Sequence, residues 1–492
     1  MKKSYLLLLM AAAAVISACK NGSDTADLGY DPDAQQLQIG KDIAVVRTTY
    51  GTVKGFIYQN VNTFLGIPYG DDTSGENRFM PPKPPKPWDG VLPTVWYPTS
   101  APQRPYTEGA TPYAQFRDRW NYDGFGEDCL KLNVWSPGLD AAKRPVLVWL
   151  HGGGFSAGNG VEQDGYMGAN FARRHDVVFV SLNHRLNSFG FSDFAAVGGE
   201  KYKHSGNVGM LDIIFALQWV HDNIAAFGGD PGNVTIMGQS GGGSKVTIAA
   251  AMPAAKGLVH KAFAMSGGST AASDKAYAEG LGAQILKTAG LKPSQIDQLQ
   301  QMPWPEYFAL ANKAAAEYNA SLPAGQRYRG FSPVADDVDI PIGDFFTSGR
   351  DDVPCVPMIL STTTNEFVSD RDTPEQENLT RERHREDDGA QLRRERRGHL
   401  RRIRPDLPRQ QPLRRLLHRE LLPPERHPDR EQQARAGTAG LPGMVQLVSA
   451  HLRRPAPRLP LPGHQLLVQQ HGPDVFSYRR RQGAARALRQ DG

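Results

Sequence analysis

Short apolar runs alternate with helical patterns between about residues 45 and 380. Residues 146–150 (VLVWL) and 177–182 (VVFVSL) are almost continuously apolar over the length of a strand, which is typical of strands buried on both faces of a parallel sheet. Strands of this kind, separated by helices, predict an α/β fold with a central, mostly parallel sheet flanked by helices. With 40% hydrophobic residues, the chain can bury a core of that size.

The clearest helical pattern lies between residues 210 and 227, where apolar residues recur every three or four positions. Such a stripe predicts a helix that packs one face onto the sheet. Residues 228–232 (GGDPG) are expected to end this helix, and residues 234–237 (VTIM) to form the next strand. The stripe consists of Leu211, Ile214, Leu217, Val220 and Ile224.

The N-terminus has the parts of an export signal. Lys2 and Lys3 precede an apolar stretch at residues 5–16, which is too short to span a membrane, and small residues lead to Cys19. A cysteine there resembles a lipoprotein box, so residues 1–19 are predicted to be a lipoprotein signal peptide and residues 20–45 a polar tether. Lipid on Cys19 would anchor the exported protein to a membrane of the cell envelope. An ordinary signal peptide with a chance cysteine is the alternative.

The pattern is lost after about residue 380. Residues 381–492 contain 25 arginines, no lysine and 12 acidic residues, whereas residues 1–380 contain 31 basic and 39 acidic ones, so the net charge of +5 describes neither part. No period persists, which predicts a disordered or poorly folded tail. A nucleic-acid-binding arm is the alternative, but the tail lacks interleaved aromatic residues and follows an export signal. No nucleic-acid partner is therefore expected.

Residues 238–242 (GQSGG) match the pattern G-x-S-x-G. The serine follows a predicted strand directly and precedes a run of small residues that can open a helix. A nucleophile elbow needs this arrangement, because the tight turn pushes the hydroxyl out at the top of the sheet. The context favours Ser240 as a nucleophile over a glycine-rich turn with a capping serine.

Residues 151–155 (HGGGF) follow the predicted strand 146–150. Acyl transfer places negative charge on the carbonyl oxygen, and backbone N–H groups already aimed at that point stabilise it. Glycine lets the backbone come close enough to do so. The predicted oxyanion hole consists of the amides of Gly153, Gly154 and Gly241, and a merely flexible loop is the alternative.

Several motifs in order resemble the type B carboxylesterases, the group that includes the cholinesterases. Residues 126–134 (GEDCLKLNV) and 64–69 (FLGIPY) are similar to two signature blocks of that family, and residues 207–209 and 228–231 fit as well. The resemblance covers about residues 45–380. It implies an α/β-hydrolase fold and hydrolysis of a small-molecule carboxylic ester through an acyl-serine. The usual partner cysteine upstream of Cys129 is missing, so Cys129 is expected to be free.

The resemblance also implies a Ser-Glu-His triad. Residues 356–360 (VPMIL) are expected to form a strand, and the segment after it is similar to the family segment that supplies the acid. This assigns Glu366 to orienting the catalytic base. A solvated surface glutamate is the alternative for Glu366.

None of the seven histidines in residues 381–492 stands in a strand-loop pattern that fits the base. Residues 471–474 (HGPD) match the family pattern in letters alone. Without a histidine in place, the Ser240 hydroxyl keeps its proton, so the chain as it stands is predicted to be an impaired esterase.

A shifted reading frame would account for the tail. A frame one base later permits DIEKMMAP for residues 383–390, VYLYR for 458–462, and APH followed by alanine for 483–486. The first peptide is an ordinary helical sequence, the second resembles a late strand of the family, and the third resembles its catalytic histidine segment. Residues 46–380 are thus predicted to be a C-terminally incomplete α/β-hydrolase domain, and residues 381–492 a frame-shifted tail.

Two other functions stay open. One is a non-catalytic binding or adhesion protein on the same fold, since a fold does not dictate function; such relatives usually lack the nucleophile, which is present here. The other is a pseudoenzyme produced by the altered tail. The sequence contains no metal-ligand spacing, phosphate loop or cofactor fingerprint, so neither a metal nor a cofactor is expected.

Overall fold

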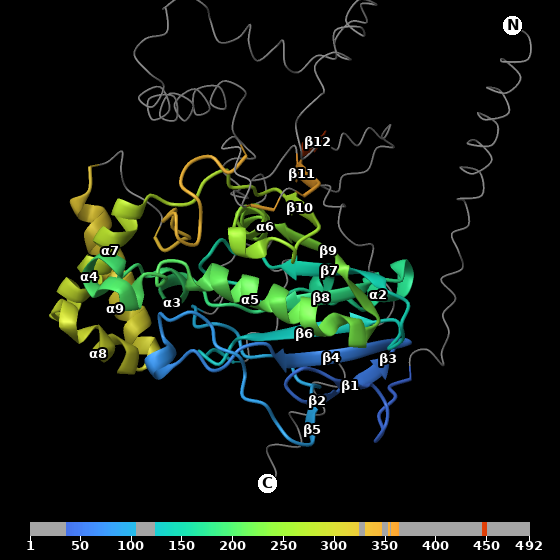
Figure 1. The fold of residues 1–492 in the computed structure, drawn as a ribbon. Helices are drawn as coiled ribbons and strands as arrows, with labels where there is room; N and C mark the ends of the chain where they lie inside the picture. The colour runs from blue at the N-terminus through green and yellow to red at the C-terminus, as the bar shows by residue number, and fades with distance from the viewer. Residues whose placement is uncertain are drawn as a thin grey trace, which may run out of the picture.

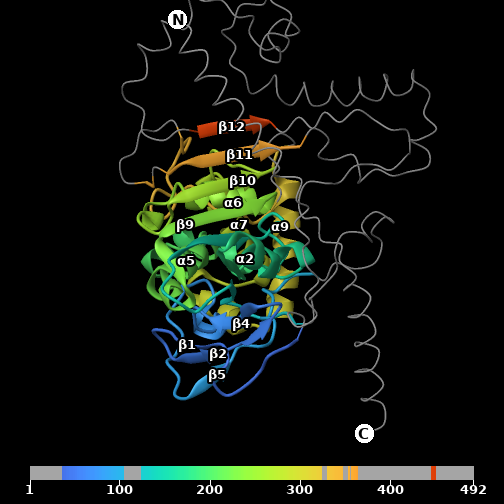
Figure 2. The same ribbon diagram turned by 90° about the vertical axis from the view of Figure 1, so that its right-hand side faces the viewer.

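A computed structural model describes residues 36–104, 124–323, 330–346, 353–354, 356–363 and 445–449. Within these ranges the chain forms a nine-stranded mixed sheet in the order β12-β11-β10-β9-β7-β8-β6-β4-β3 and a three-stranded sheet in the order β1-β2-β5. Figure 2 shows the strands of the large sheet stacked from β12 at one edge to β4 near the other. The small sheet lies beyond that second edge (Figure 1).

The strands from β12 to β8 run parallel, whereas β6, β4 and β3 pair antiparallel. The strands of the large sheet are β3 (Phe56–Tyr58), β4 (Val61–Pro68), β6 (Lys131–Ser136), β7 (Arg144–Leu150), β8 (Val178–Leu182), β9 (Gly229–Gln239), β10 (Lys261–Met265), β11 (Met358–Thr362) and β12 (Val445–Ser449). Those of the small sheet are β1 (Val45–Arg47), β2 (Thr52–Lys54) and β5 (Val91–Pro93).

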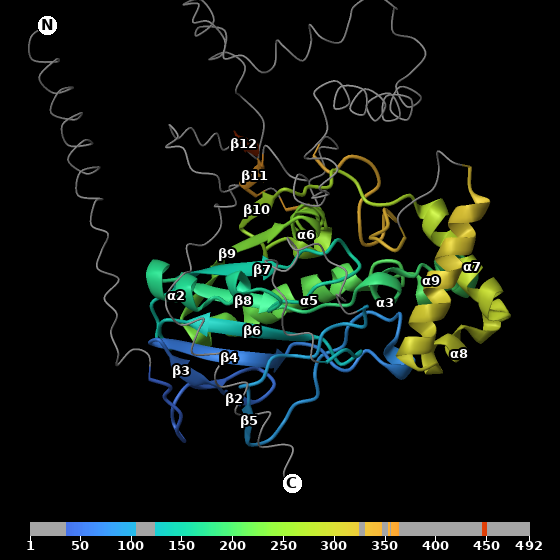
Figure 3. The ribbon, with the colours of Figure 1, turned by 180° about the vertical axis from the view of Figure 1, so that it is seen from behind.

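Helices lie along the sheet and beyond one end of it. Figures 1 and 3 show α7, α8 and α9 gathered together to one side of the strands. Among the described residues, no helix is long and apolar enough to cross a membrane. The α-helices are α2 (Ala169–His175), α3 (Asn187–Phe191), α4 (Ala195–Gly198), α5 (Val208–Asn223), α6 (Gly241–Ala249), α7 (Lys275–Ala289), α8 (Ile296–Gln301) and α9 (Trp304–Ser321).

Each face of the large sheet has its own hydrophobic core. Side chains alternate between the faces of a strand, so Val146 and Val148 of β7 join the core that includes α5 and α6. Leu147 and Trp149 point the other way, into a second core that contains Ala172 of α2. This explains why the strands are apolar without alternation in the sequence.

Helix α5 confirms the predicted helix but is buried on more than one side. Leu217 and Val220 of the predicted stripe are buried, as expected, yet Ile213 and Trp219 outside the stripe are buried too. The helix continues as a 3-10 turn (Ile224–Phe227) and ends at Gly228, whose φ of 82° is left-handed. The next strand, β9, begins at Gly229, earlier than the predicted 234.

Arg78 forms a buried ion pair with Glu127, which belongs to the family-like block 126–134. Nε of Arg78 donates to Oε1 of Glu127 at 2.6 Å, and Nη2 donates to Oε2 at 2.5 Å. Nη1 donates to the carbonyls of Leu299 and Met302. These contacts join the N-terminal blocks to the end of α8.

A second buried ion pair joins Arg185, after β8, to Asp212 of α5. Nε and Nη2 of Arg185 donate to the two carboxylate oxygens of Asp212 at 2.9 and 2.6 Å, and Nη1 donates to the carbonyl of Met80. Both side chains are almost wholly inaccessible to solvent. Each charge is therefore compensated only by its partner and by the backbone.

Strand β12 lies in the part of the chain where the sequence pattern predicts no strand. It pairs in parallel with β11 along Met358–Thr362 and extends the sheet by one strand. Its short apolar stretch at 445–448 (VQLV) gives too little periodicity to mark a strand within an Arg- and Pro-rich tail. Cys129 is free, as expected. It is also buried, and burial raises the pKa of its thiol.

We predict that Asp193→Asn stabilises the protein near neutral pH. The Asp193 carboxyl is buried and accepts a hydrogen bond from the amide of Ala195, and burial raises its pKa from 3.8 to about 6. Because the pKa of Asp193 is higher in the folded than in the unfolded protein, the contribution of this carboxyl to stability is fully present below pH 3.8 and is lost as pH rises through 6. The variant should gain roughly 2–3 kcal/mol at pH 7.

Thermal unfolding between pH 3.5 and 7.5 tests this expectation. Asp89→Asn, at an exposed position, is the matched control and should follow the parent curve. An Asp193→Asn curve parallel to that of the parent over the whole range would contradict the predicted linkage.

Candidate active site

Ser240 occupies a strained turn between β9 and α6. Its φ of 57° and ψ of −124° are unusual for a residue with a side chain. The turn is held by two backbone hydrogen bonds: the Ser240 amide donates to the carbonyl of Met265 at 2.9 Å, and the Ser244 amide donates to the carbonyl of Ser240 at 3.1 Å. The predicted strand-turn-helix arrangement is therefore present.

The glycines around the turn are required because a larger residue would not fit there. A Cβ added to Gly242 would overlap the carbonyl oxygen of Leu150, and one added to Gly267 would overlap that of Ser240. Both neighbours are backbone atoms, one at the end of β7 and one in the serine turn itself, so neither can swing aside as a flexible side chain would. The turn can close only because β7, β9 and β10 bring their peptide groups together here.

The oxyanion loop, residues 151–154, leaves the end of β7 and passes over the turn. Gly153 and Gly154 have φ values of 82° and 64°, in the left-handed region that glycine tolerates. Gly154 packs so closely on Gly241 that a Cβ at Gly241 would overlap its backbone nitrogen. A Cβ built on Gly152 would lie 3.8 Å from Cβ of Ser240. The predicted loop and serine are thus brought together.

This arrangement concentrates partial positive charge around one point. The first amides of α6 have no partner within the helix, and the helix dipole places its positive end next to Ser240. Gly241 begins that helix, and Gly154 lies against it from the other side. Such a site can attract an oxyanion that forms at a carbonyl bound next to Ser240.

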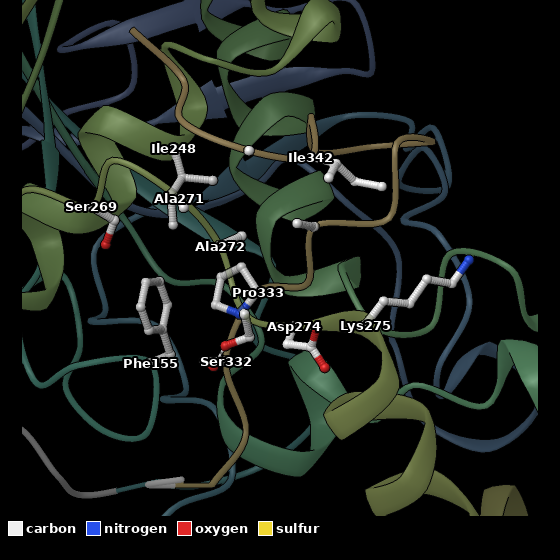
Figure 4. A pocket seen from close by; sticks show the side chains of 13 residues that line it. Phe155, Ile248, Ser269, Ala271, Ala272, Asp274, Lys275, Ser332, Pro333 and Ile342 are labelled. Carbon is white, nitrogen blue, oxygen red and sulfur yellow. Dashed lines mark hydrogen bonds between the residues drawn. The ribbon is translucent and has the colours of Figure 1, made fainter. Parts of the chain in front are cut away.

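A pocket of about 620 Å³ lies beside the oxyanion loop. Phe155, which directly follows the loop, lines it on one side, and Lys275 lies across from Phe155 (Figure 4). Ile248 of α6 and Ile342 contribute apolar wall. Ser240 is not among the lining residues, so the pocket adjoins the turn rather than covering it.

Two further predicted positions, Glu366 and Cys19, lie outside the described residues, as do all the histidines of the tail. The structure therefore places the serine and the three glycines. Within the described ranges, no group of three or more His, Cys, Asp or Glu side chains could hold a metal ion.

A buried polar cluster beneath the oxyanion loop was not predicted. Nζ of Lys245, on α6, donates to the carbonyl of His151 at 2.9 Å, and the rings of His151 and His184 stack with their centroids 5.1 Å apart. All three side chains are buried. Lys245 is the one charged residue among residues 241–249, which marks it in the sequence without revealing its contact with His151.

The ring nitrogens fix the protonation of both histidines. Nδ1 of His151 faces the carbonyl of Gly152 and Nδ1 of His184 faces that of Arg185, so each Nδ1 carries the proton. Burial first, and then the charge of Lys245, lower the pKa of both histidines well below the usual value. Both rings are therefore neutral near pH 7.

A parallel sheet, a serine in a strained turn at the carboxyl end of a central strand, and glycine amides beside it together define an α/β-hydrolase. The chain belongs to the carboxylesterase family, whose model matches residues 42–454. The match includes β12 and runs past residue 380, where the sequence pattern places the end of the domain.

Relatives with known activities cover part of this chain. It is 35% identical over 339 residues to the para-nitrobenzyl esterase of Bacillus subtilis, which accounts for 68% of this chain and 66% of that protein. It is 40% identical to the phenmedipham hydrolase of Pseudarthrobacter oxydans over 45% of this chain and 42% of that protein. The chain thus spans just under two thirds of the first relative and about two fifths of the second.

Solved structures show the same fold. An esterase from Clostridium hathewayi that can hydrolyse aliphatic aromatic polyesters superposes with a TM-score of 0.61 at 36% identity, over 70% of this chain and 67% of that one. The carboxylesterase of Geobacillus stearothermophilus gives 0.60 at 32% identity, over 80% and 73%.

Proposed function

We propose that this protein is a carboxylic ester hydrolase in which Ser240 is the nucleophile. The observation that carries the proposal is the contact between the strained serine turn and the oxyanion loop, at which Gly154 packs directly on Gly241. In the proposed reaction, Oγ of Ser240 attacks the ester carbonyl carbon, and the amides of Gly153, Gly154 and Gly241 stabilise the oxyanion. The alcohol leaves, and water then releases the acid from the acyl-serine.

The substrate is proposed to be a small-molecule ester with one substituent in the pocket beside Phe155. That pocket has apolar walls from Ile248 and Ile342 and a polar edge at Asp274 and Lys275. The similarity to the para-nitrobenzyl esterase of Bacillus subtilis supports this class of substrate. We also propose that lipid on Cys19 anchors the exported protein to the cell envelope.

The rest of the triad is proposed from the family resemblance. Glu366 would orient a histidine base, and that base would take the proton from Ser240. We propose that residues 381–492 are read in a shifted frame, so that the chain as it stands lacks the base and works slowly. A non-catalytic binding protein is the competing function, and the intact serine turn argues against it.

Covalent labelling tests the nucleophile. A fluorophosphonate probe should modify Ser240, slowly in the chain as it stands and rapidly in a chain with the restored frame, because the probe needs an activated hydroxyl. Peptide mass spectrometry locates the adduct. Ser240→Ala should remove it in both chains. No adduct in either chain, or one on another residue, would reject the proposed nucleophile.

A further inference from the structure

We propose that Lys245 is a positioning residue that holds the oxyanion loop and supplies positive charge beneath it. The role rests on the proposed function, because it serves the oxyanion that ester hydrolysis creates. Nζ of Lys245 lies 6.0 Å from the ring centroid of Phe155, which lines the pocket. Its hydrogen bond goes to the peptide group between His151 and Gly152, and through that group it acts on the loop.

The hydrogen bond from Lys245 lies at the start of the oxyanion loop, where it can fix the orientation of the first peptide group. Nζ of Lys245 donates to the carbonyl oxygen of His151, the first residue of the oxyanion loop. A trans peptide group points its C=O and the following N–H in opposite directions. Fixing this carbonyl therefore orients the Gly152 amide, from which the loop turns toward Gly153 and Gly154.

Packing alone does not account for a lysine here. The side chain is 0% exposed. Within the described part of the chain, its charge has one hydrogen bond, no ion pair, and a cation–π contact with Phe155 at 6.0 Å from the ring centroid. Burying a charge in that way is unfavourable, and methionine would fill the same space without that penalty. The surroundings therefore favour a function for Lys245 that uses its charge.

Below pH 7 no neighbouring charge cancels the positive charge of Lys245 within the described part of the chain. His151 and His184 are neutral near pH 7, and the buried Arg185–Asp212 pair compensates itself. The carboxylate of Glu162 favours the charged form of Lys245 through space. A cation hydrogen-bonded to the His151 carbonyl polarises that peptide group. Because the protein interior screens charge only weakly, the electric field of the lysine also acts on the amides beside Ser240.

A pH dependence follows from the geometry and the burial. Burial lowers the pKa of Lys245 to about 7, with Glu162 acting in the opposite direction. Below that pH the lysine is charged and supports the oxyanion; above it the lysine is neutral. The turnover rate should therefore lose part of its value as pH rises through 7.

Two substitutions in the full chain separate positioning from packing. Lys245→Met should lower kcat for p-nitrophenyl butyrate about tenfold, less than the loss of a direct oxyanion donor, with KM nearly unchanged. It should also abolish the fall in rate near neutral pH. Lys245→Arg should restore most of kcat and move that fall to higher pH. A Lys245→Met protein with the parent kcat and pH profile would overturn the proposal, even if its Tm were lower.

A second measurement does not depend on turnover. Hydrogen exchange of peptides covering residues 151–158 should be faster in Lys245→Met and return to the parent rate in Lys245→Arg, while other peptides stay unchanged. Lys261→Met, on the exposed end of β10, is the control and should leave both readouts unchanged. If neither the parent nor the chain with the restored frame hydrolyses the ester, the proposed function fails, and exchange alone decides the positioning role. Equal loop exchange in parent and Lys245→Met overturns that role.

Discussion

Translating the codons after residue 380 one base later is expected to raise the rate of ester hydrolysis by on the order of 10⁴-fold or more. The serine turn and the oxyanion loop are built from residues before 270, so both chains should bind the acyl group. The restored chain would add the histidine that takes the Ser240 proton. Initial rates with p-nitrophenyl acetate for the two chains measure the difference.

Ser240→Ala in each chain is the control for background hydrolysis. Equal rates in the two chains would show that the tail as it stands already supplies the base, or that none is used. The nucleotide sequence around codons 375–390 gives an independent answer, because the absence of a family-like peptide in the alternative frame would end the frame-shift proposal.

Asp212→Ala is expected to destabilise the protein by about 3–5 kcal/mol. The substitution leaves the Arg185 guanidinium buried without a carboxylate, and two of its hydrogen bonds disappear. It also removes the acceptor for the Arg185 amide. Urea unfolding at pH 7, followed by circular dichroism, measures the change in the free energy of unfolding.

Lys313→Met is the control that removes an ion pair on the surface instead of a buried one. Its partner Glu317 is 3.8 Å away, and both side chains are largely exposed, so the loss should stay below about 1 kcal/mol. The double variant Arg185→Met/Asp212→Leu should recover much of the stability lost in Asp212→Ala, because it leaves no buried charge. A loss in Asp212→Ala as small as that in Lys313→Met would refute the role given to the buried pair.

The fold could be predicted where burial on both faces of a strand produces a continuous apolar run in the sequence. The apolar runs at 146–150 and 177–182 correspond to β7 and β8, because strands covered on both faces need no polar positions. The start of β9 was placed too late, since Gly229 pairs with Arg144 through backbone groups that composition does not reveal. Strand β12 was missed because five residues carry too weak a periodic signal.

The candidate site could be predicted in part because its chemistry demands glycine. Six of the ten residues in 238–242 and 151–155 are glycine, and the structure shows backbone atoms where a Cβ would have to fit at several of them. Lys245 and the stacked histidines could not be predicted in the same way. Their meeting depends on how α6 lies against the ends of β7 and β8, and no spacing along the chain encodes that contact.

The turn at Ser240 also bears on the order in which the protein assembles. Its backbone contacts come from Leu150, Met265 and Gly267, which lie far apart along the chain, so the turn cannot form from a local segment. During synthesis the last of these peptide groups leaves the ribosome with Gly267. From then on a nascent chain contains the three residues whose backbone atoms contact the serine turn, while β10 still waits for its neighbour β11, whose residues 358–362 are translated later.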